Sequence, residues 1–386
     1  MNEPPAAETM RDWVRANRRP ALQIAASIVL LYAVCWPIVA PDLHQFLFPW
    51  IDHILTAGRI GAFATPFSNY TPPYLYLMSL ASIVTTNKLV IVKSLSVLAA
   101  VAIAVAVRRA IGNRPFVNEA TLLVVVLPSV LANGAVYGQC DGYWAAACVM
   151  ATAAAIDGRP RAMLIWFGVG LAFKVQAMFL APFVLVILVQ RRVRLIEWPI
   201  PLAIYVLAML PAWLVGWPAA DLAKVYVRQG EYFNTIGTAP SPWAVVAAFH
   251  EREPLAIFSV GYVAAAVAAA LYVVAFARAR LDGLATMRVA LLSAMMIPFL
   301  LPKMHERYFL LADLLSFAIA IIARDRRSTQ IFVACEAAST IAIFGSMFDF
   351  YLVVAASVVP ATIALCLLLG QIRRDVTRNQ AGTRKR

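Results

Sequence analysis

Four ionisable side chains stand together in the segment FLLPKMHERYFLL, residues 299–311, between two apolar runs. They are Lys303, His305, Glu306 and Arg307, in a chain that carries few charges elsewhere. Lysine binds phosphate as a point charge and arginine binds it through its planar fork. If the segment continues as a helix, Lys303 and Arg307 share one face with Glu306 beside Lys303, a spacing that also suits a simple ion pair. We favour phosphate binding, with the ion pair as the alternative.

Another cation lies inside the apolar segment 161–190, which has about 30 residues where two crossings need roughly 20 each. The sequence predicts two half-depth helices that meet at residues 173–176, with Lys174 and Gln176 below the membrane surface. A charge and irregular backbone are tolerated there only where they line protein or water. We expect a hydrated cavity open to the outer side, and an anionic group such as phosphate as the partner of Lys174.

A carboxylate for this cavity is predicted in PDLHQFLFPW, residues 41–50, directly after the first apolar run. Asp42 stands at the predicted membrane boundary, where a carboxylate could take a proton from an attacking hydroxyl group. The alternative is that Asp42 caps a short helix after Pro41, because Asp is a preferred N-cap residue. Asp52 is the competing carboxylate.

The segment VYGQCDGYW, residues 136–144, links two apolar runs at the same predicted face. Gln139 and Asp141 could hold sugar hydroxyl groups, and Tyr143 and Trp144 offer ring faces for stacking or for anchoring at the interface. A plain turn is the alternative, because the two glycines of the segment favour turns.

The composition identifies the elements that must position these residues. The chain has 386 residues, 62% of them hydrophobic and 14% charged, with a mean hydropathy of +0.77. These values are those of an all-α polytopic membrane protein and exclude an ordinary soluble domain. The five cysteines suggest no disulfide framework.

The net charge of +13 is spread over short loops rather than gathered in one patch. If these loops face the cytoplasm, they obey the positive-inside rule and require no nucleic acid as a partner. The basic clusters lie at residues 11–19, 108–114, 159–161, 191–194, 278–288, 324–327 and 373–386.

This charge pattern predicts about twelve membrane-spanning helices with both termini in the cytoplasm. Residues 1–372 form one membrane domain, and residues 373–386 form a basic cytoplasmic tail that we expect to be disordered. The first outer loop, residues 41–88, is long and carries interfacial helices. The predicted spans are 21–40, 89–108, 117–136, 142–157, 161–173, 177–190, 197–216, 254–276, 285–301, 308–323, 329–346 and 351–372.

Transfer of a sugar from a lipid-phosphate donor needs a carboxylate base at the interface and cations slightly deeper. The base removes a proton from the acceptor hydroxyl, the sugar carbon is attacked, and the departing phosphate must be stabilised. The polyprenyl tail of such a donor lies in the bilayer, which explains an enzyme built of spans.

The order of these segments resembles that of bacterial membrane glycosyltransferases of the GT-C superfamily, over residues 20–325. The segments are PDLHQFLFPW, FSNYTPPYLYL, YGQCDGYW, GLAFKVQ and LPKMHERYF. The HER step is similar to the HEK of dolichyl-phosphate-glucose glucosyltransferases.

This resemblance implies an inverting mannosyl- or glucosyltransferase-like enzyme that takes a hexose from a polyprenyl phosphate, with Asp42 as the base. It also implies binding roles around the donor phosphate and sugar for the KVQ and HER segments, that is for Lys174, Gln176, His305, Glu306 and Arg307. Asn69 and Tyr70 are expected to shape the acceptor entrance. The first loop lacks the adjacent acidic pair of some relatives, so we expect no metal and no other cofactor.

The acceptor is expected to be lipid-linked or a glycan, and the active site to face the periplasm from a bacterial inner membrane. One rival is a transporter or flippase of a lipid-linked or anionic substrate. Transporters often repeat their halves, and the sequence has no second copy of GLAFKVQ or MHERY. The other rival is a structural partner in an envelope-assembly complex. A cavity open to one side only would favour the enzyme.

Overall fold

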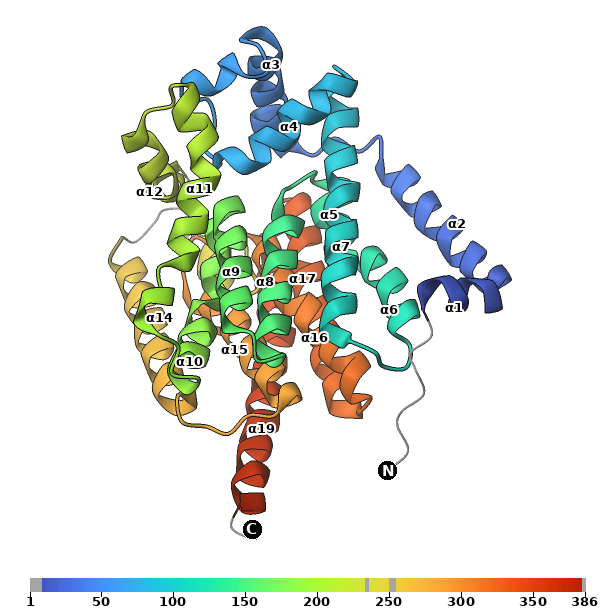
Figure 1. Ribbon diagram of the computed structural model, residues 1–386, viewed down its shortest axis with the longest axis vertical. Coiled ribbons are helices and arrows are strands. Elements are labelled where there is room, and N and C mark those ends of the chain that lie inside the picture. The colour runs from blue at the N-terminus through green and yellow to red at the C-terminus, as the bar shows by residue number, and fades with distance from the viewer. Residues whose placement is uncertain (1–8, 233–235, 250–254, 384–386) are drawn as a thin grey trace.

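A computed structural model describes residues 9–232, 236–249 and 255–383 of the chain. These residues are 81% helical and contain no strand, which confirms the predicted all-α class. All five cysteines are free thiols. The helices lie mostly side by side along one direction, with shorter helices across one end (Figure 1).

The elements before the break at Lys174 include a long first outer loop that is itself helical. In chain order they are α1 (Met10–Ala16), α2 (Arg18–Cys35), the π-helical turn η1 (Leu43–Leu47), α3 (Phe48–Thr56), η2 (Gly61–Ala64), α4 (Pro72–Val84), α5 (Lys88–Ile111), α6 (Val117–Leu123), η3 (Val124–Val126), α7 (Pro128–Leu131), the π-helical turn η4 (Ala132–Val136), α8 (Asp141–Ile156) and α9 (Pro160–Phe173).

The elements after the break end in a long helix that projects from the body (Figure 1). They are η5 (Val175–Leu180), α10 (Ala181–Gln190), η6 (Leu195–Glu197), α11 (Ile200–Val215), α12 (Ala219–Tyr232), α13 (Pro242–Phe249), α14 (Leu255–Phe276), α15 (Gly283–Leu300), η7 (Glu306–Phe309), α16 (Leu310–Ala323), α17 (Arg326–Met347), α18 (Tyr351–Ala356) and α19 (Val358–Thr383).

Seven helices in the described residues are long and apolar enough to cross a membrane, or eight if one bent pair counts as a span. One of them, α5, has 24 residues and a length of about 36 Å. The sequence predicts about twelve crossings. The remaining predicted spans correspond to shorter helices, because α8 and α16 begin below the end of the bundle, and α9 and α10 are separated by the predicted break.

The bent pair consists of residues 117–126 and 128–136, which meet at 49°. The bend falls at Pro128, which has no N–H group to continue the helical hydrogen bonds. Glu336 of α17 caps the second half: its Oε1 accepts a hydrogen bond from the Ser129 backbone N–H at 2.7 Å, and its Oε2 accepts one from the Ser129 hydroxyl at 3.0 Å.

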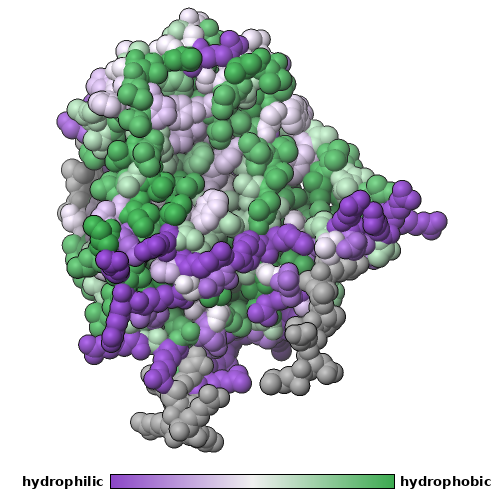
Figure 2. All heavy atoms as spheres, viewed as in Figure 1, coloured by the Kyte–Doolittle hydropathy of each residue, from purple (hydrophilic) through white to green (hydrophobic). Residues whose placement is uncertain are grey.

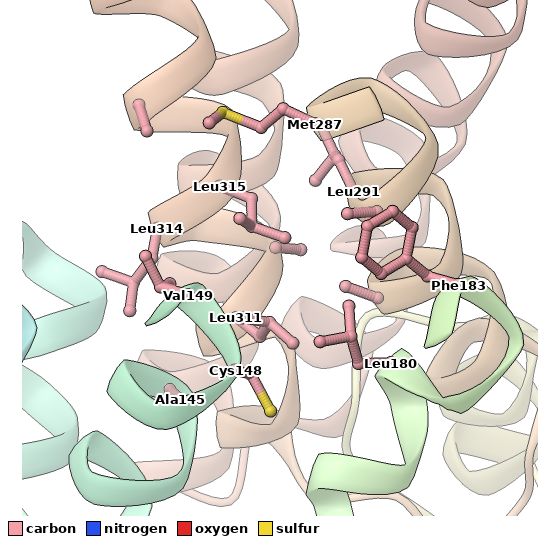
Figure 3. Close-up of a cluster of buried hydrophobic side chains, with 14 of the residues drawn as sticks. Ala145, Cys148, Val149, Leu180, Phe183, Met287, Leu291, Leu311, Leu314 and Leu315 are labelled. Carbon is pink, nitrogen blue, oxygen red and sulfur yellow. The ribbon is translucent and has the colours of Figure 1, made fainter. Parts of the chain in front are cut away.

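The main hydrophobic core lies among α8, α10, α15 and α16 (Figure 3). Alanines dominate the buried face of α8, so that α5 and α9 approach it closely. In this core Leu311 and Leu315 of α16 point toward the side where Phe183 and Leu291 lie, and Leu314 points toward Val149 of α8 (Figure 3). This packed layer forms a floor beneath the shorter helices of the outer loop.

The first outer loop has a hydrophobic cluster of its own, which contains buried residues of η1, α3, α4 and α11. Tyr74 and Tyr76 of α4 belong to this packing: the Tyr74 hydroxyl donates to the Gly138 carbonyl at 3.2 Å, and the Tyr76 oxygen accepts from the Ala212 N–H at 2.9 Å. The loop is therefore a folded cap over one end of the bundle.

Hydrophilic residues form a band near the other end, where α1 lies and α19 projects (Figure 2). This agrees with the predicted gathering of basic loops at one face. The last helix continues to Thr383, through most of the segment that the sequence predicts to be disordered. Where this segment starts, α19 is held by packing of Ile372 and by an ion pair of 2.8 Å between Arg288 and Asp375.

Candidate active site

Asp42 lies between α2 and η1, and its side chain is 27% exposed. Its Oδ2 atom accepts hydrogen bonds from Arg307 Nη1 at 2.7 Å and from Gln139 Nε2 at 2.9 Å. The carboxylate does not cap the following helical turn, which was the alternative interpretation. Asp52, the competing carboxylate, is 55% exposed and pairs with Lys88 at 2.8 Å.

Gln139 connects Asp42 to the interior of the protein. Its Oε1 accepts a hydrogen bond of 2.7 Å from the Tyr70 hydroxyl, while its Nε2 donates to Asp42. Both ends of the Gln139 amide are thus used within the protein. In this structure Gln139 holds the carboxylate of Asp42, and contact of Gln139 with sugar hydroxyls stays a prediction.

Lys174 lies at the predicted helix break, with α9 ending at Phe173 and extended backbone at residue 174. It is 2% exposed, and its Nζ donates to Asp141 Oδ1 at 2.7 Å. Trp144 Nε1 donates to the same oxygen at 2.8 Å. In this structure Asp141 is therefore the counter-ion of Lys174, whereas the sequence predicts an anionic ligand group as its partner.

The HER segment does not continue as a helix, which was the condition for Lys303 and Arg307 to share one face. Lys303 has a left-handed backbone with φ of +60°, and the 3₁₀ turn η7 begins only at Glu306. Lys303 and Arg307 therefore do not share a helical face. The Lys303 ammonium lies 5.2 Å from the centre of the Phe258 ring and does not line the cavity described below.

Glu306 and Arg307 are buried side chains that approach each other from one turn. Glu306 Oε2 accepts hydrogen bonds from Thr238 Oγ1 at 2.5 Å and from Ser346 Oγ at 3.3 Å, and Glu306 Oε1 lies 3.6 Å from Arg307 Nε. The Arg307 guanidinium lies 4.8 Å from the centre of the Tyr137 ring. Arg307 Nε is 3.9 Å from Asp141 Oδ2, so the Glu306–Arg307 pair lies next to the Lys174–Asp141 pair.

A cavity of about 540 Å³ unites these groups. Eight of the predicted site residues line it: Asp42, Asn69, Tyr70, Gln139, Lys174, His305, Glu306 and Arg307. Asp141 lies just behind this wall. Gln176 is buried in η5 away from the lining, which separates it from the site that the sequence predicts for it.

Three further lining residues matter for the site and are absent from the predicted set. Tyr137 stands within the segment VYGQCDGYW, so its position next to Gln139 was a usable signal. Thr238 and Ser346, which hydrogen-bond Glu306, come from loops and helix ends without a recognisable motif. Only the folded chain brings them to the HER segment.

The charges in the site act on one another. Partial burial would by itself raise the pKa of the Asp42 carboxyl, but the charge and hydrogen bond of Arg307, with help from His305 and Lys174, lower that pKa below its ordinary 3.8. Burial also lowers the pKa of His305 below 6.5, against the opposing effect of Glu306. At neutral pH Asp42 is therefore ionised and His305 is neutral.

The all-helical fold is similar to that of a GT-C membrane glycosyltransferase of known structure. No protein-family model matches the chain, and no curated protein matches it in sequence. The chain is similar in structure to ArnT, a GT-C glycosyltransferase, in its crystal structure from Cupriavidus metallidurans bound to undecaprenyl phosphate. The TM-score is 0.53 at 11% sequence identity, covering 92% of this chain and 77% of that one.

Proposed function

We propose that this protein is a membrane glycosyltransferase that moves a hexose from a polyprenyl-phosphate donor to a hydroxyl group of a lipid- or envelope-linked acceptor. The observation that carries the proposal is the meeting of Asp42, Lys174 and Arg307 at one cavity, although they come from distant parts of the chain. The undecaprenyl phosphate bound to the similar ArnT supports a lipid phosphate as the donor's leaving group.

In the proposed reaction Asp42 acts as general base. Its Oδ1 accepts no hydrogen bond from the described residues, whereas Oδ2 accepts two. Oδ1 takes the proton of the acceptor hydroxyl, and the hydroxyl oxygen attacks the anomeric carbon from the face opposite the phosphate. The bond from that carbon to the phosphate oxygen breaks, and the phosphate leaves with the electron pair, which inverts the sugar. Arg307 and Lys174 stabilise the charge of the departing phosphate.

The positions of the cavities favour an enzyme over a transporter. A second cavity of about 490 Å³ lies at the carboxyl end of α5. It shares no lining residue with the first cavity. The hydrophobic core of α8, α15 and α16 lies between them. A site separated from the cavity at the opposite end suits group transfer at the outer face, which we propose to be periplasmic.

Transfer from a radiolabelled polyprenyl-phosphate hexose to membrane acceptors tests this proposal. Asp42→Asn is expected to reduce transfer at least about a hundredfold, because it removes a general base. The matched control is Asp52→Asn, which changes an exposed carboxylate of the same loop and should leave transfer unchanged. Unchanged transfer by Asp42→Asn would eliminate Asp42 as the base.

A further inference from the structure

Both cations of the site already have carboxylate partners in this structure. Arg307 pairs with Asp42 and Lys174 pairs with Asp141, each at 2.7 Å. Glu306 and Asp349 also line the cavity, so the described residues place four carboxylates beside two cations, and a donor phosphate would add negative charge to a site that already has an excess of it. Close like charges repel strongly where water is excluded. Binding a phosphate therefore requires one of the cations to change its partner.

Lys174 is poorly placed for such a change. Its ammonium group is enclosed by Asp141 and by the rings of Tyr70 and Tyr308, whose centres lie 5.2 Å and 5.3 Å away. Asp141 is completely buried, so parting the two would leave an uncompensated charge in the interior. Lys174 is thus a fixed charge whose field reaches the cavity.

Arg307 has the freedom that Lys174 lacks. Its partner Asp42 is partly exposed at the cavity, so that carboxylate can be hydrated when the ion pair opens. The Arg307 Nε atom is buried without a hydrogen-bond acceptor among the described residues. The guanidinium group has five N–H donors in a planar fork, which suits a phosphate better than a single carboxylate oxygen.

Asp42 does not lose its position when Arg307 leaves. Gln139 donates to the same Oδ2 atom and is itself held by the Tyr70 hydroxyl. The carboxylate would therefore keep one hydrogen bond and its orientation while losing its nearest cation. A carboxylate without that cation is the stronger base.

We propose that the donor phosphate takes Arg307 from Asp42, and that Gln139 keeps the released carboxylate in place as a positioning residue. This inference rests on the proposed function. It makes donor binding the event that prepares the base, so that the donor must bind before the acceptor hydroxyl is activated. The charged and titratable groups that face Asp42 are Arg307, His305 and Lys174, with Tyr137 beside them.

Binding of undecaprenyl phosphate to the purified full-length protein in lipid nanodiscs tests the exchange without knowledge of sugar or acceptor. The four proteins compared are the wild type, Asp42→Asn, Arg307→Gln and the double variant. Because Asp42 competes for Arg307, Asp42→Asn should tighten binding roughly five- to tenfold, and Arg307→Gln should weaken it about tenfold or more. In the Arg307→Gln background, Asp42→Asn should change the affinity less than about twofold, since there is no shared cation to release.

Two results would overturn the exchange while leaving the proposed function intact. The first is unchanged affinity in Asp42→Asn, and the second is a gain that persists in the Arg307→Gln background, which would show simple repulsion. Asp42→Ala provides a second variant, and thermal unfolding of each protein shows that it is folded. Absence of binding to the folded wild type would instead overturn the proposed donor class and this inference with it.

Discussion

Asp42 and Arg307 determine each other's chemistry, because one hydrogen bond of 2.7 Å joins them across the cavity. The same is true of Lys174 and Asp141 behind it. The depth of Lys174 could be predicted from the sequence, since too few apolar residues surround it for two complete spans. Its partner could not, because Asp141 is 33 residues away and a turn rich in glycine has several possible geometries.

The Asp42–Arg307 pair predicts a change in the pH dependence of transfer. Burial raises the pKa of Asp42, but the charge and hydrogen bond of Arg307, together with His305 and Lys174, bring it below 3.8, so Asp42 is ionised through the neutral range. Arg307→Gln removes the largest of the opposing effects, so the pKa rises. We therefore expect the acidic limb of kcat/KM against pH to move toward neutral pH in this variant. Arg161→Gln, at an exposed arginine elsewhere, is the control, and an acidic limb that stays in place would contradict the assignment.

The buried Lys174–Asp141 pair predicts non-additive effects on stability. Lys174→Met leaves the Asp141 carboxylate buried without its cation and should destabilise the protein by about 3–5 kcal/mol. Adding Asp141→Asn removes that charge and should recover most of the loss. Thermal unfolding of the two single variants and the double variant measures the coupling, and strictly additive losses would show that the two charges do not depend on each other.

At the scale of elements, the site residues share one kind of position. Asp42 precedes η1, Asp141 begins α8, Lys174 stands between α9 and η5, and Glu306 begins η7. Side chains at helix breaks and helix starts can point along a helix axis, and these four side chains point toward the cavity region. The break at Lys174 was predictable from length alone. The turn at Lys303 was not, because its positive φ depends on contacts such as the 2.8 Å hydrogen bond from its N–H group to the Ile236 carbonyl.

The bend at Pro128 gives a prediction at this scale. Glu336 satisfies two donors of Ser129, so Glu336→Ala leaves both of them buried, at a cost of about 1–3 kcal/mol each. Glu336→Gln retains an acceptor for one of them and should lose less stability. The temperature of unfolding in detergent checks this order, and equal losses in the two variants would show that the cap does not hold the bend.

For the whole molecule, hydropathy and the spacing of basic loops predict the all-helical bundle and the gathering of hydrophilic loops near one end. They predict about twelve crossings, whereas seven or eight spans in the described residues are long and apolar enough, because helices such as α8 and α16, with 16 and 14 residues, are shorter than a full span. The packed outer cap was harder to foresee. Tyr74 and Tyr76 are of the residue type that anchors helices at a membrane interface. Only the folded structure shows that they form hydrogen bonds with Gly138 and Ala212.

The proposed orientation places the cavity end outside the cytoplasm, and cysteine labelling tests it. Thr86→Cys puts a thiol in an exposed loop at the cavity end, and Asn113→Cys puts one in an exposed loop at the opposite end. With the exposed Cys366 replaced by serine in both, a membrane-impermeant maleimide should label residue 86 in intact cells and residue 113 only after permeabilisation. The reverse pattern would invert the proposed topology.

Asp42 and Arg307 are 265 residues apart in the chain. During synthesis the ribosome must therefore complete most of the polypeptide before the first loop meets its cation. A nascent or prematurely terminated product lacks the guanidinium group to which we propose that the donor phosphate binds. The proposed site is thus complete only late in biogenesis, once nearly the entire bundle has been inserted.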